Sequence, residues 1–268
     1  MIHNDIIQWI DYFAPPALAC DWDNVGLMTG SLKDKTKSVL FCLDLTLADI
    51  EMAAKSGINL IITHHPLIFD KEAFIEEGSL LKEKLDTLKE AGITVYSAHT
   101  NLDFAPGGVN DVLFRKLKLI DPKKVDDDTH LYGLLPEAEP LESFYDRVTA
   151  EFESFNAKIV KPKELELDDN ITTVAVCCGA FDGETKWLVE NKIDVVVTGE
   201  MKHSRALDLM ELGIAGIELG HYETEIAGIK SLAAHVKKSL QGQLEQDGVA
   251  VRIAAKTNPY YDLIGLSE

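Results

Sequence analysis

A regular alternation of apolar, strand-like runs with helical segments most constrains the fold of this chain. The strand-like runs lie at residues 39–43, 58–62 and 93–98 in the first half and at 174–177, 195–197 and 215–219 in the second. Between the first two runs, Thr46 is a typical helix cap and Gly57 is a typical helix end. Strands that alternate with helices predict a parallel sheet whose faces the helices cover.

The alternation occurs twice, which predicts an α/β fold with two related α/β lobes, each with a parallel or mixed sheet flanked by helices. A charged stretch at residues 121–128 follows the first series. A long helix at 224–240 and a last strand at 249–254 close the pattern. We therefore expect a first lobe made of residues 1–126 plus 222–268 and a second lobe made of residues 127–221.

The charge balance limits the partners of the protein. The chain has 26 Lys and Arg against 45 Asp and Glu, a formal net charge of −19. That field repels phosphate backbones and argues against direct binding of nucleic acid, although bound divalent ions would still admit small anionic substrates. The sequence shows no signal peptide and no apolar run of the roughly 18 to 20 residues that cross a membrane. With four cysteines that fit reduced thiols, we expect a cytoplasmic protein.

Histidines follow two of the predicted strands at the point where each strand ends. His64 and His65 come directly after the second strand-like run, and Pro66 prevents the strand from continuing. His99 and Asp103 come after the third run. In open α/β sheets, ligands bind beyond the carboxyl ends of the strands, so we expect these side chains at the rim of one sheet.

A second group of candidate ligands begins the last long helix. His221 and Glu225 are four residues apart, so both face the same point from one helical turn, whereas Glu223 points away. With the four residues above, these imidazoles and carboxylates exceed what one tetrahedral ion uses. The pattern therefore favours two divalent ions that share a bridging carboxylate.

Single-residue explanations stay open at this point. Asp103 alone also fits a cap of the loop before Gly107, and Glu225 alone fits a first-turn carboxylate stabilised by the helix dipole. Glu200 and His203, which follow another predicted strand, fit groups that contact either the ligands or a substrate. We take both as candidate catalytic residues.

Six segments carry a resemblance to a known family. They are Trp22-Asp23-Asn24-Val25-Gly26-Leu27, Thr63-His64-His65-Pro66-Leu67-Ile68-Phe69, Ala98-His99-Thr100-Asn101-Leu102-Asp103, Gly107-Gly108-Val109-Asn110-Asp111, Thr198-Gly199-Glu200 and Gly220-His221-Tyr222-Glu223-Thr224-Glu225. In this order and combination they resemble the dinuclear-metal, ring-forming hexamer family known as GTP cyclohydrolase 1 type 2 homologues. The likeness covers most of the chain.

The resemblance implies a metal centre and an assembly. It implies that His64, His65, Asp103, His221 and Glu225 bind two metal ions per chain, with a carboxylate bridging them. Mixed imidazole and carboxylate ligands suit Zn, Fe, Mn or Co, and nothing in the sequence chooses among these metals. The resemblance also implies two α/β lobes and a toroidal homohexamer whose sites face an inner cavity.

The function that the resemblance implies is metal-dependent hydrolysis. In the GTP reaction, water activated by the metals attacks C8 of guanine, the imidazole ring opens and formate leaves, with Glu200 or His203 carrying protons. A phosphoester or amide hydrolase with the same two ions, and a metal-bound hexameric scaffold or regulatory interaction protein, are the alternatives. The segment Cys177–Gly183 departs from the small glycine-rich turn of the family, so a substrate contact there is in question, and the role of His99 is open.

Overall fold

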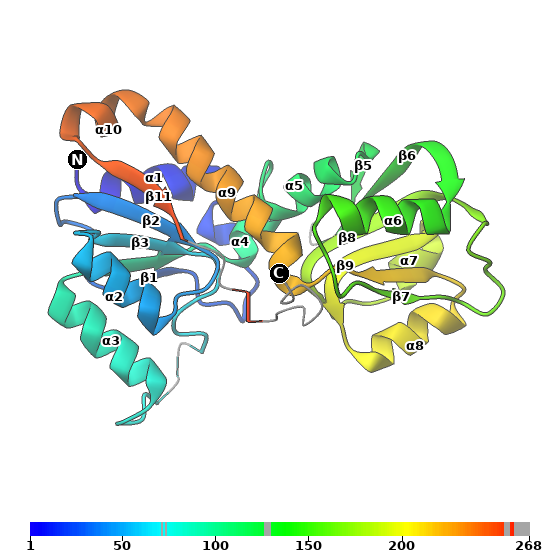
Figure 1. Cartoon of the computed structure of the whole chain (residues 1–268), viewed down its shortest axis with the longest axis horizontal. Helices are drawn as coiled ribbons and strands as arrows, with labels where there is room; N and C mark the ends of the chain where they lie inside the picture. Colours follow the sequence, from blue (N-terminus) through cyan, green and yellow to red (C-terminus); the bar gives the residue numbers. More distant parts are fainter. Residues whose placement is uncertain (71, 73, 126–129, 255–257, 260–268) are drawn as a thin grey trace, which may run out of the picture. The chain divides into compact units, whose positions relative to one another are not determined.

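The chain forms two compact α/β units, each with one sheet flanked by helices, as the sequence predicts (Figure 1). The computed structural model describes residues 1–70, 72, 74–125, 130–254 and 258–259. Unit 1 consists of the described residues of Met1–Gly108 and Ile229–Thr257, and unit 2 consists of those of Val109–Gly228 and Asn258–Glu268.

The sheet of unit 1 has five strands in the order β1-β4-β3-β2-β11. Its strands are β1 (Gly26–Thr29), β2 (Ser38–Cys42), β3 (Leu60–Thr63), β4 (Thr94–Ser97) and β11 (Ala250–Ile253). Strands β11, β2, β3 and β4 are parallel, and β1 pairs with β4 in the antiparallel direction. All residues of β2, β3 and β4 are buried, which accounts for their continuous apolar runs in the sequence.

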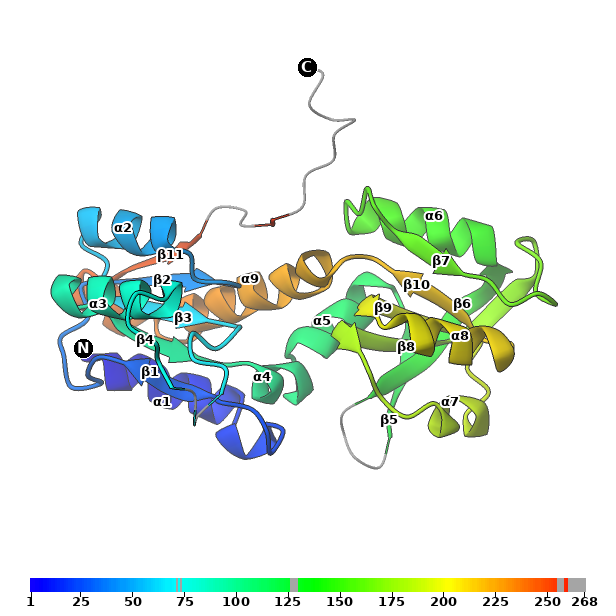
Figure 2. The same cartoon turned by 90° about the horizontal axis from the view of Figure 1, so that it is seen from below.

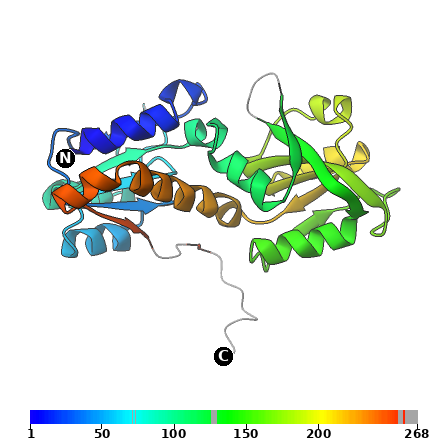
Figure 3. The same cartoon turned by 90° about the horizontal axis from the view of Figure 1, so that it is seen from above.

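Helices cover both faces of this sheet. They are α1 (His3–Phe13), the 3-10 turn η1 (Pro16–Leu18), α2 (Leu47–Lys55), α3 (Leu80–Ala91), α4 (Thr100–Phe104), α10 (Gln241–Asp247) and the second part of α9 (His221–Ser239). Figures 2 and 3 show α1 and α2 on opposite sides of the sheet. The expected boundaries of α2 are confirmed, because the Thr46 hydroxyl accepts a hydrogen bond from the Asp49 amide and Gly57 follows the last turn.

The sheet of unit 2 has six strands in the order β5-β6-β8-β9-β10-β7, of which β8, β9 and β10 are parallel. Its strands are β5 (Ile120–Lys124), β6 (Leu131–Pro140), β7 (Lys158–Val160), β8 (Asn170–Phe181), β9 (Val195–Met201) and β10 (Ala215–Glu218). Its helices are α5 (Val109–Lys116), α6 (Leu141–Glu151), α7 (Lys186–Glu190), α8 (His203–Glu211) and the first part of α9. Trp187 and Leu188 of α7 and Leu209 of α8 pack in one core cluster, while α6 lies on the other face (Figures 2 and 3).

The boundaries of the two units differ from the expected ones. The expected boundary between residues 126 and 127 lies outside the described residues, but β5, which precedes it, is already paired with β6 in the second sheet. The pairing of β5 with β6, together with the packing of α5 against β6 and β8, therefore places residues from Val109 onward in unit 2. At the other end, the expected boundary at residues 221/222 is displaced to Gly228 and Ile229, within α9. None of the described helices is both long enough and apolar enough to cross a membrane.

Two local differences from the predicted elements bear on the site. Strand β8 does not end at Cys177 but continues to Phe181 after a register shift between Cys177 and Ala180. The segment predicted as a turn is therefore part of the sheet for most of its length. In unit 1, Asp103 lies in the short helix α4, which follows His99 and was not predicted.

The backbone at Gly30 lies close to Thr94, the first residue of β4, and a substitution of Gly30 tests this contact. Its φ is +90°, and a Cβ atom there would lie 2.6 Å from the Thr94 Cα atom. We expect Gly30→Ala to lower the free energy of unfolding by about 2 to 5 kcal/mol, because a left-handed penalty adds to an overpacking penalty. Urea unfolding followed by tryptophan fluorescence measures this change.

Gly57→Ala is the matched control. Gly57 also has a positive φ of +70°, but a Cβ atom there meets open space. Only the left-handed penalty of about 1 to 2 kcal/mol applies to it. Equal losses of unfolding free energy in the two variants would show that the contact with Thr94 does not contribute to stability.

Candidate metal centre

The carboxyl ends of three adjacent parallel strands in unit 1 carry the first group of candidate ligands. Asp44 follows β2, His64 and His65 follow β3, and His99 follows β4. The register pairs Cys42 with Thr63 and Thr63 with Ser97, so the three strands end at the same level. From one strand end to the next these side chains are about 20 to 35 residues apart along the chain, roughly the spacing of one βαβ repeat, and the sheet brings them together.

Three imidazole rings lie together at this edge. One ring nitrogen each from His64, His65 and His99 lies within 4.8 Å of the other two, a spacing at which they could hold a metal ion. The His64 ring centroid is 5.1 Å from that of His65 and 5.1 Å from that of His99. His64 is fully buried and His99 nearly so, whereas His65 is partly exposed. The sequence left the role of His99 open, and the structure brings its ring into this cluster.

Each of these three imidazoles has its Nδ1 atom against an oxygen acceptor. The acceptors of His64, His65 and His99 are the Ala98 carbonyl at 2.9 Å, Asp44 Oδ1 at 2.7 Å and Asp23 Oδ1 at 2.9 Å. A carbonyl or carboxylate oxygen only accepts, so each Nδ1 carries the proton and donates. In a neutral imidazole the lone pair then lies on Nε2, the arrangement found when Nε2 binds a metal.

Asp103 extends this cluster with a carboxylate. Its Oδ1 atom lies 3.4 Å from His64 Nε2, and the residue is 8% exposed. With the proton on Nδ1, Nε2 of His64 is an acceptor, and so is the carboxylate oxygen. Two acceptors this close are stable only with a proton or a cation between them, which suits a metal site.

Asp23 fixes the position of the His99 ring by a hydrogen bond. The buried carboxylate accepts hydrogen bonds from the His99 ring, from the Thr100 amide at 3.0 Å and from the Thr100 hydroxyl at 2.6 Å. Burial by itself raises the pKa of the Asp23 carboxyl. The hydrogen bonds from His99 and Thr100 outweigh burial and lower this pKa from 3.8 to about 2. The side chain is therefore a charged acceptor at any physiological pH.

Unit 2 carries the second group of candidate ligands at the carboxyl ends of its parallel strands. His221 and Glu225 lie in the first turns of α9, and Nε2 of His221 is 3.2 Å from Glu225 Oε2. The Nδ1 atom of His221 lies 3.1 Å from Oε1 of Glu200, at the end of β9. A similar arrangement thus occurs in both units, since in His64 as in His221 an oxygen acceptor faces Nδ1 and a carboxylate faces Nε2.

Gly179 of β8 lies against the two candidate ligands of α9. A Cβ atom at this position would lie 2.3 Å from Glu225 Oε1 and 3.3 Å from His221 Nε2. Only glycine leaves room for these two side chains. The larger residues of the segment point elsewhere, because Phe181 is buried in the core of unit 2 and Asp182 pairs with Lys202 at the surface.

The other candidates have different surroundings. Glu223 accepts a hydrogen bond from the Asn258 amide at 2.6 Å, in agreement with its expected orientation away from Glu225. His203 begins α8 and is exposed, and its proposed role stays a prediction. Sequence reasoning missed Asp44, although it follows β2 in the same way that His64 follows β3.

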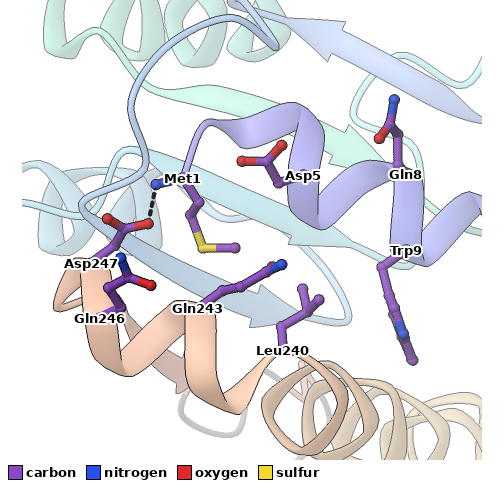
Figure 4. Close-up of a pocket in the computed structure, with 8 residues that line it drawn as sticks. All are labelled: Met1, Asp5, Gln8, Trp9, Leu240, Gln243, Gln246 and Asp247. Carbon is purple, nitrogen blue, oxygen red and sulfur yellow. Dashed lines mark hydrogen bonds and ion pairs between the residues drawn. The ribbon is translucent and has the colours of Figure 1, made fainter.

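A cavity of about 520 Å³ lies elsewhere in unit 1, at α1 and α10 (Figure 4). Gln8 and Trp9 line it from α1, and Gln243 lines it from α10. The amino group of Met1 forms an ion pair with Asp247 at its edge. None of the candidate ligands lines this cavity, so it is separate from the clustered imidazoles.

Comparison with known sequences gives consistent matches over most of the chain. The family model described as Duf34/NIF3 (NGG1p interacting factor 3) matches residues 1–259. A Methanocaldococcus jannaschii protein named GTP cyclohydrolase 1 type 2 homolog is 34% identical over 239 residues, which cover 88% of this chain and 95% of that protein.

Solved structures give the same result. The structure described as reduced HcgD from Methanocaldococcus jannaschii is 33% identical to this chain, with a TM-score of 0.79, and covers 94% of this chain and 97% of its own. Staphylococcus aureus protein SA1388 has a TM-score of 0.85 over 98% of this chain and 99% of its own. At 23% identity, this second likeness shows the fold alone.

Asp23 allows a test by pH. We expect metal-free Asp23→Asn to be less stable than wild type by about 2 kcal/mol at pH 7, since a pKa lowered from 3.8 to about 2 corresponds to that free energy. A pKa that is lower in the folded state stabilises the fold above pH 4, and this stabilisation is lost as the pH falls toward 2. The difference between the two proteins should therefore shrink over that interval in urea unfolding experiments.

Asp21→Asn is the control, because Asp21 is an exposed aspartate two residues away. It should change stability by less than about 0.5 kcal/mol. A deficit of Asp23→Asn that stays constant from pH 7 to pH 2 would contradict the assigned charge of Asp23.

Proposed function

This chain belongs to the Duf34/NIF3 family, and from that membership we propose that it is a dinuclear metal-dependent hydrolase. His64, His65 and Asp103 of unit 1 and His221 and Glu225 of unit 2 would hold two divalent ions. The observation that carries the proposal is the repeated orientation of the imidazoles, because in each unit the Nδ1–H group donates a hydrogen bond to an oxygen. Orientation of this kind is typical of histidines that bind metals.

The donor set fits divalent ions. A carboxylate oxygen of Asp103 lies 3.4 Å from Nε2 of His64, and one of Glu225 lies 3.2 Å from Nε2 of His221. In both imidazoles the ring proton is on Nδ1. A divalent cation between these acceptors offsets their repulsion and the cost of burying Asp103 and Glu225. Imidazole and carboxylate together suit Zn, Fe, Mn or Co.

The protein residues around such a centre would have distinct roles. Bound divalent ions lower the pKa of water and polarise a substrate oxygen or ring nitrogen. Asp44 and Glu200 fix the ring planes of His65 and His221 by accepting their Nδ1 protons. Glu200 and His203, which are both exposed, are the proposed carriers of protons to and from a substrate.

The proposed reaction is the opening of a guanine imidazole ring. In this reaction a first water adds at C8 and the C8–N9 bond breaks, which opens the ring and leaves C8 as a formamide. A second water then hydrolyses the formamide, so that C8 leaves as formate and the nitrogen stays as an amine. The name of the Methanocaldococcus jannaschii relative supports GTP as the substrate to test first. A phosphoester or amide hydrolase that uses the same two ions is the nearest alternative.

A regulatory interaction protein is the alternative outside enzymology. The words "interacting factor" in the family description favour it. In that case the proposed homohexamer would need metal only for assembly. Dialysis against a chelator would dissociate the hexamer, and the metal-loaded protein would show no enzymatic turnover. Light scattering with and without metal measures this.

Asp103→Asn tests the metal site. We expect the variant to lose at least one of two bound ions per chain while it stays folded, because an amide oxygen lacks the charge that compensates a divalent ion. Elemental analysis of the protein after dialysis measures the stoichiometry, and circular dichroism reports the fold. Equal metal content in variant and wild type would refute the assignment.

Glu225 and Glu223 provide a matched pair on one helical turn. Glu225→Gln should lower metal affinity about 10- to 100-fold or more, whereas Glu223→Gln should leave it unchanged, since Glu223 pairs with Asn258. Titration of the metal-free proteins with Zn²⁺ measures both affinities. Equal effects of the two substitutions would mean that charge alone, rather than ligation, is responsible.

Release of formate from GTP tests the reaction. Wild-type protein reconstituted with metal should release formate, and Asp103→Asn should lose at least about 100-fold in kcat/KM, because the activated water depends on both ions. An enzymatic assay for formate measures it. Two bound ions per chain without any formate would remove the cyclohydrolase function and leave the alternatives.

A further inference from the structure

Two exposed aromatic rings lie beside the imidazole cluster of unit 1. Trp22 is 59% exposed and Phe69 is 57% exposed, and their rings stack with centroids 5.6 Å apart and planes 27° apart. Each centroid is 6.0 Å from that of His99, which meets both rings edge-on. The pair is thus directly next to a ring that belongs to the candidate metal centre.

The loops that carry these rings are fixed to each other. The Asn24 side-chain amide donates to the Ile68 carbonyl at 2.5 Å, which joins the Trp22 loop to the Phe69 loop. The Asn24 backbone amide donates to Asp23 at 2.7 Å, and Asp23 in turn holds His99. Because neighbouring residues are bound in this way, the two rings keep their relative position without a ligand, and binding would cost little conformational entropy.

Other exposed aromatic residues differ from this pair. Tyr12 and Phe74 are more exposed still, at 85% and 86%, and neither has a stacked partner among the ring contacts of the described residues. Single exposed apolar side chains are normal on a protein surface. Two stacked rings on braced loops, next to a cluster of imidazoles, are the arrangement of a binding platform.

We propose that Trp22 and Phe69 form a stacking platform for a planar nitrogen heterocycle of the purine type. Aromatic side chains stack on such rings because every base has a π-face. The inference rests on the proposed function, since the platform would hold the ring that the metal centre opens. It also explains the Trp22-Asp23-Asn24 triplet, in which one residue stacks, the next orients His99 and the third joins the loops.

The surrounding charge indicates which part of a nucleotide the platform takes. Asp21 and Asp70, the neighbours of the two rings in the chain, are exposed, and the protein as a whole carries a net charge of −19. Carboxylates next to the rings repel phosphate groups. The platform therefore takes the uncharged base, and guanosine is the better probe of it than GTP.

Binding of guanosine to the full-length, metal-loaded protein tests the platform. Guanosine should quench the fluorescence of Trp22 in wild type, and Trp22→Ala and Phe69→Ala should each weaken binding about tenfold or more by calorimetry. Trp22→Phe should keep most of the affinity, because it retains a ring. Tyr12→Ala, which removes an exposed aromatic ring of α1, should have no effect, and ribose, which has no aromatic ring, should not bind.

The outcomes separate this inference from the proposed hydrolase. Guanosine that binds wild type but not Trp22→Ala, without any release of formate, would support the platform and contradict the cyclohydrolase reaction. Formate release with the same KM in wild type, Trp22→Ala and Phe69→Ala would support the hydrolase and overturn the platform. Absence of guanosine binding to wild type, or equal binding to all variants, would also overturn it.

Discussion

The parallel pairing of β2, β3 and β4 is the constraint on which the candidate site depends. The register of these strands ends all three at one level, and the backbone then turns away from the sheet. Asp44, His64 and His99 leave the sheet at these ends. Since these strands are buried on both faces, a slip of one residue would exchange the side chains of the two faces and disrupt the packing on each, so the core packing also fixes the positions of the ligands.

Carboxylates then give three of the imidazoles their orientation. Asp23 is a charged group in a buried place, and it is stabilised there by donors from His99 and Thr100. Glu200 has the corresponding relation to His221 in unit 2. Acceptors of this kind fix the direction of the Nε2 lone pair, because that direction depends on the partner of Nδ1.

Prediction from sequence succeeded where the signal is local. The α/β class, the strand runs and the cap of α2 follow from side-chain patterns within about a dozen residues. It failed where the decisive partner is distant in sequence. The extent of β8 depends on hydrogen bonds to β9, and the boundary of unit 2 depends on the pairing of β5 with β6. Asp44 was missed because a lone aspartate after a strand is common in loops.

The sequence by itself determined the class of fold and, through residues that follow predicted strands or begin a helix, the candidate ligands. His64, His65 and His221 could be named without coordinates. Only the tertiary structure decided that His99 joins the first two rings, that Asp23 orients it, and that Trp22 stacks on Phe69 beside it. These are contacts between segments tens of residues apart, and the distance between such side chains depends on the packing of the whole sheet rather than on any local pattern.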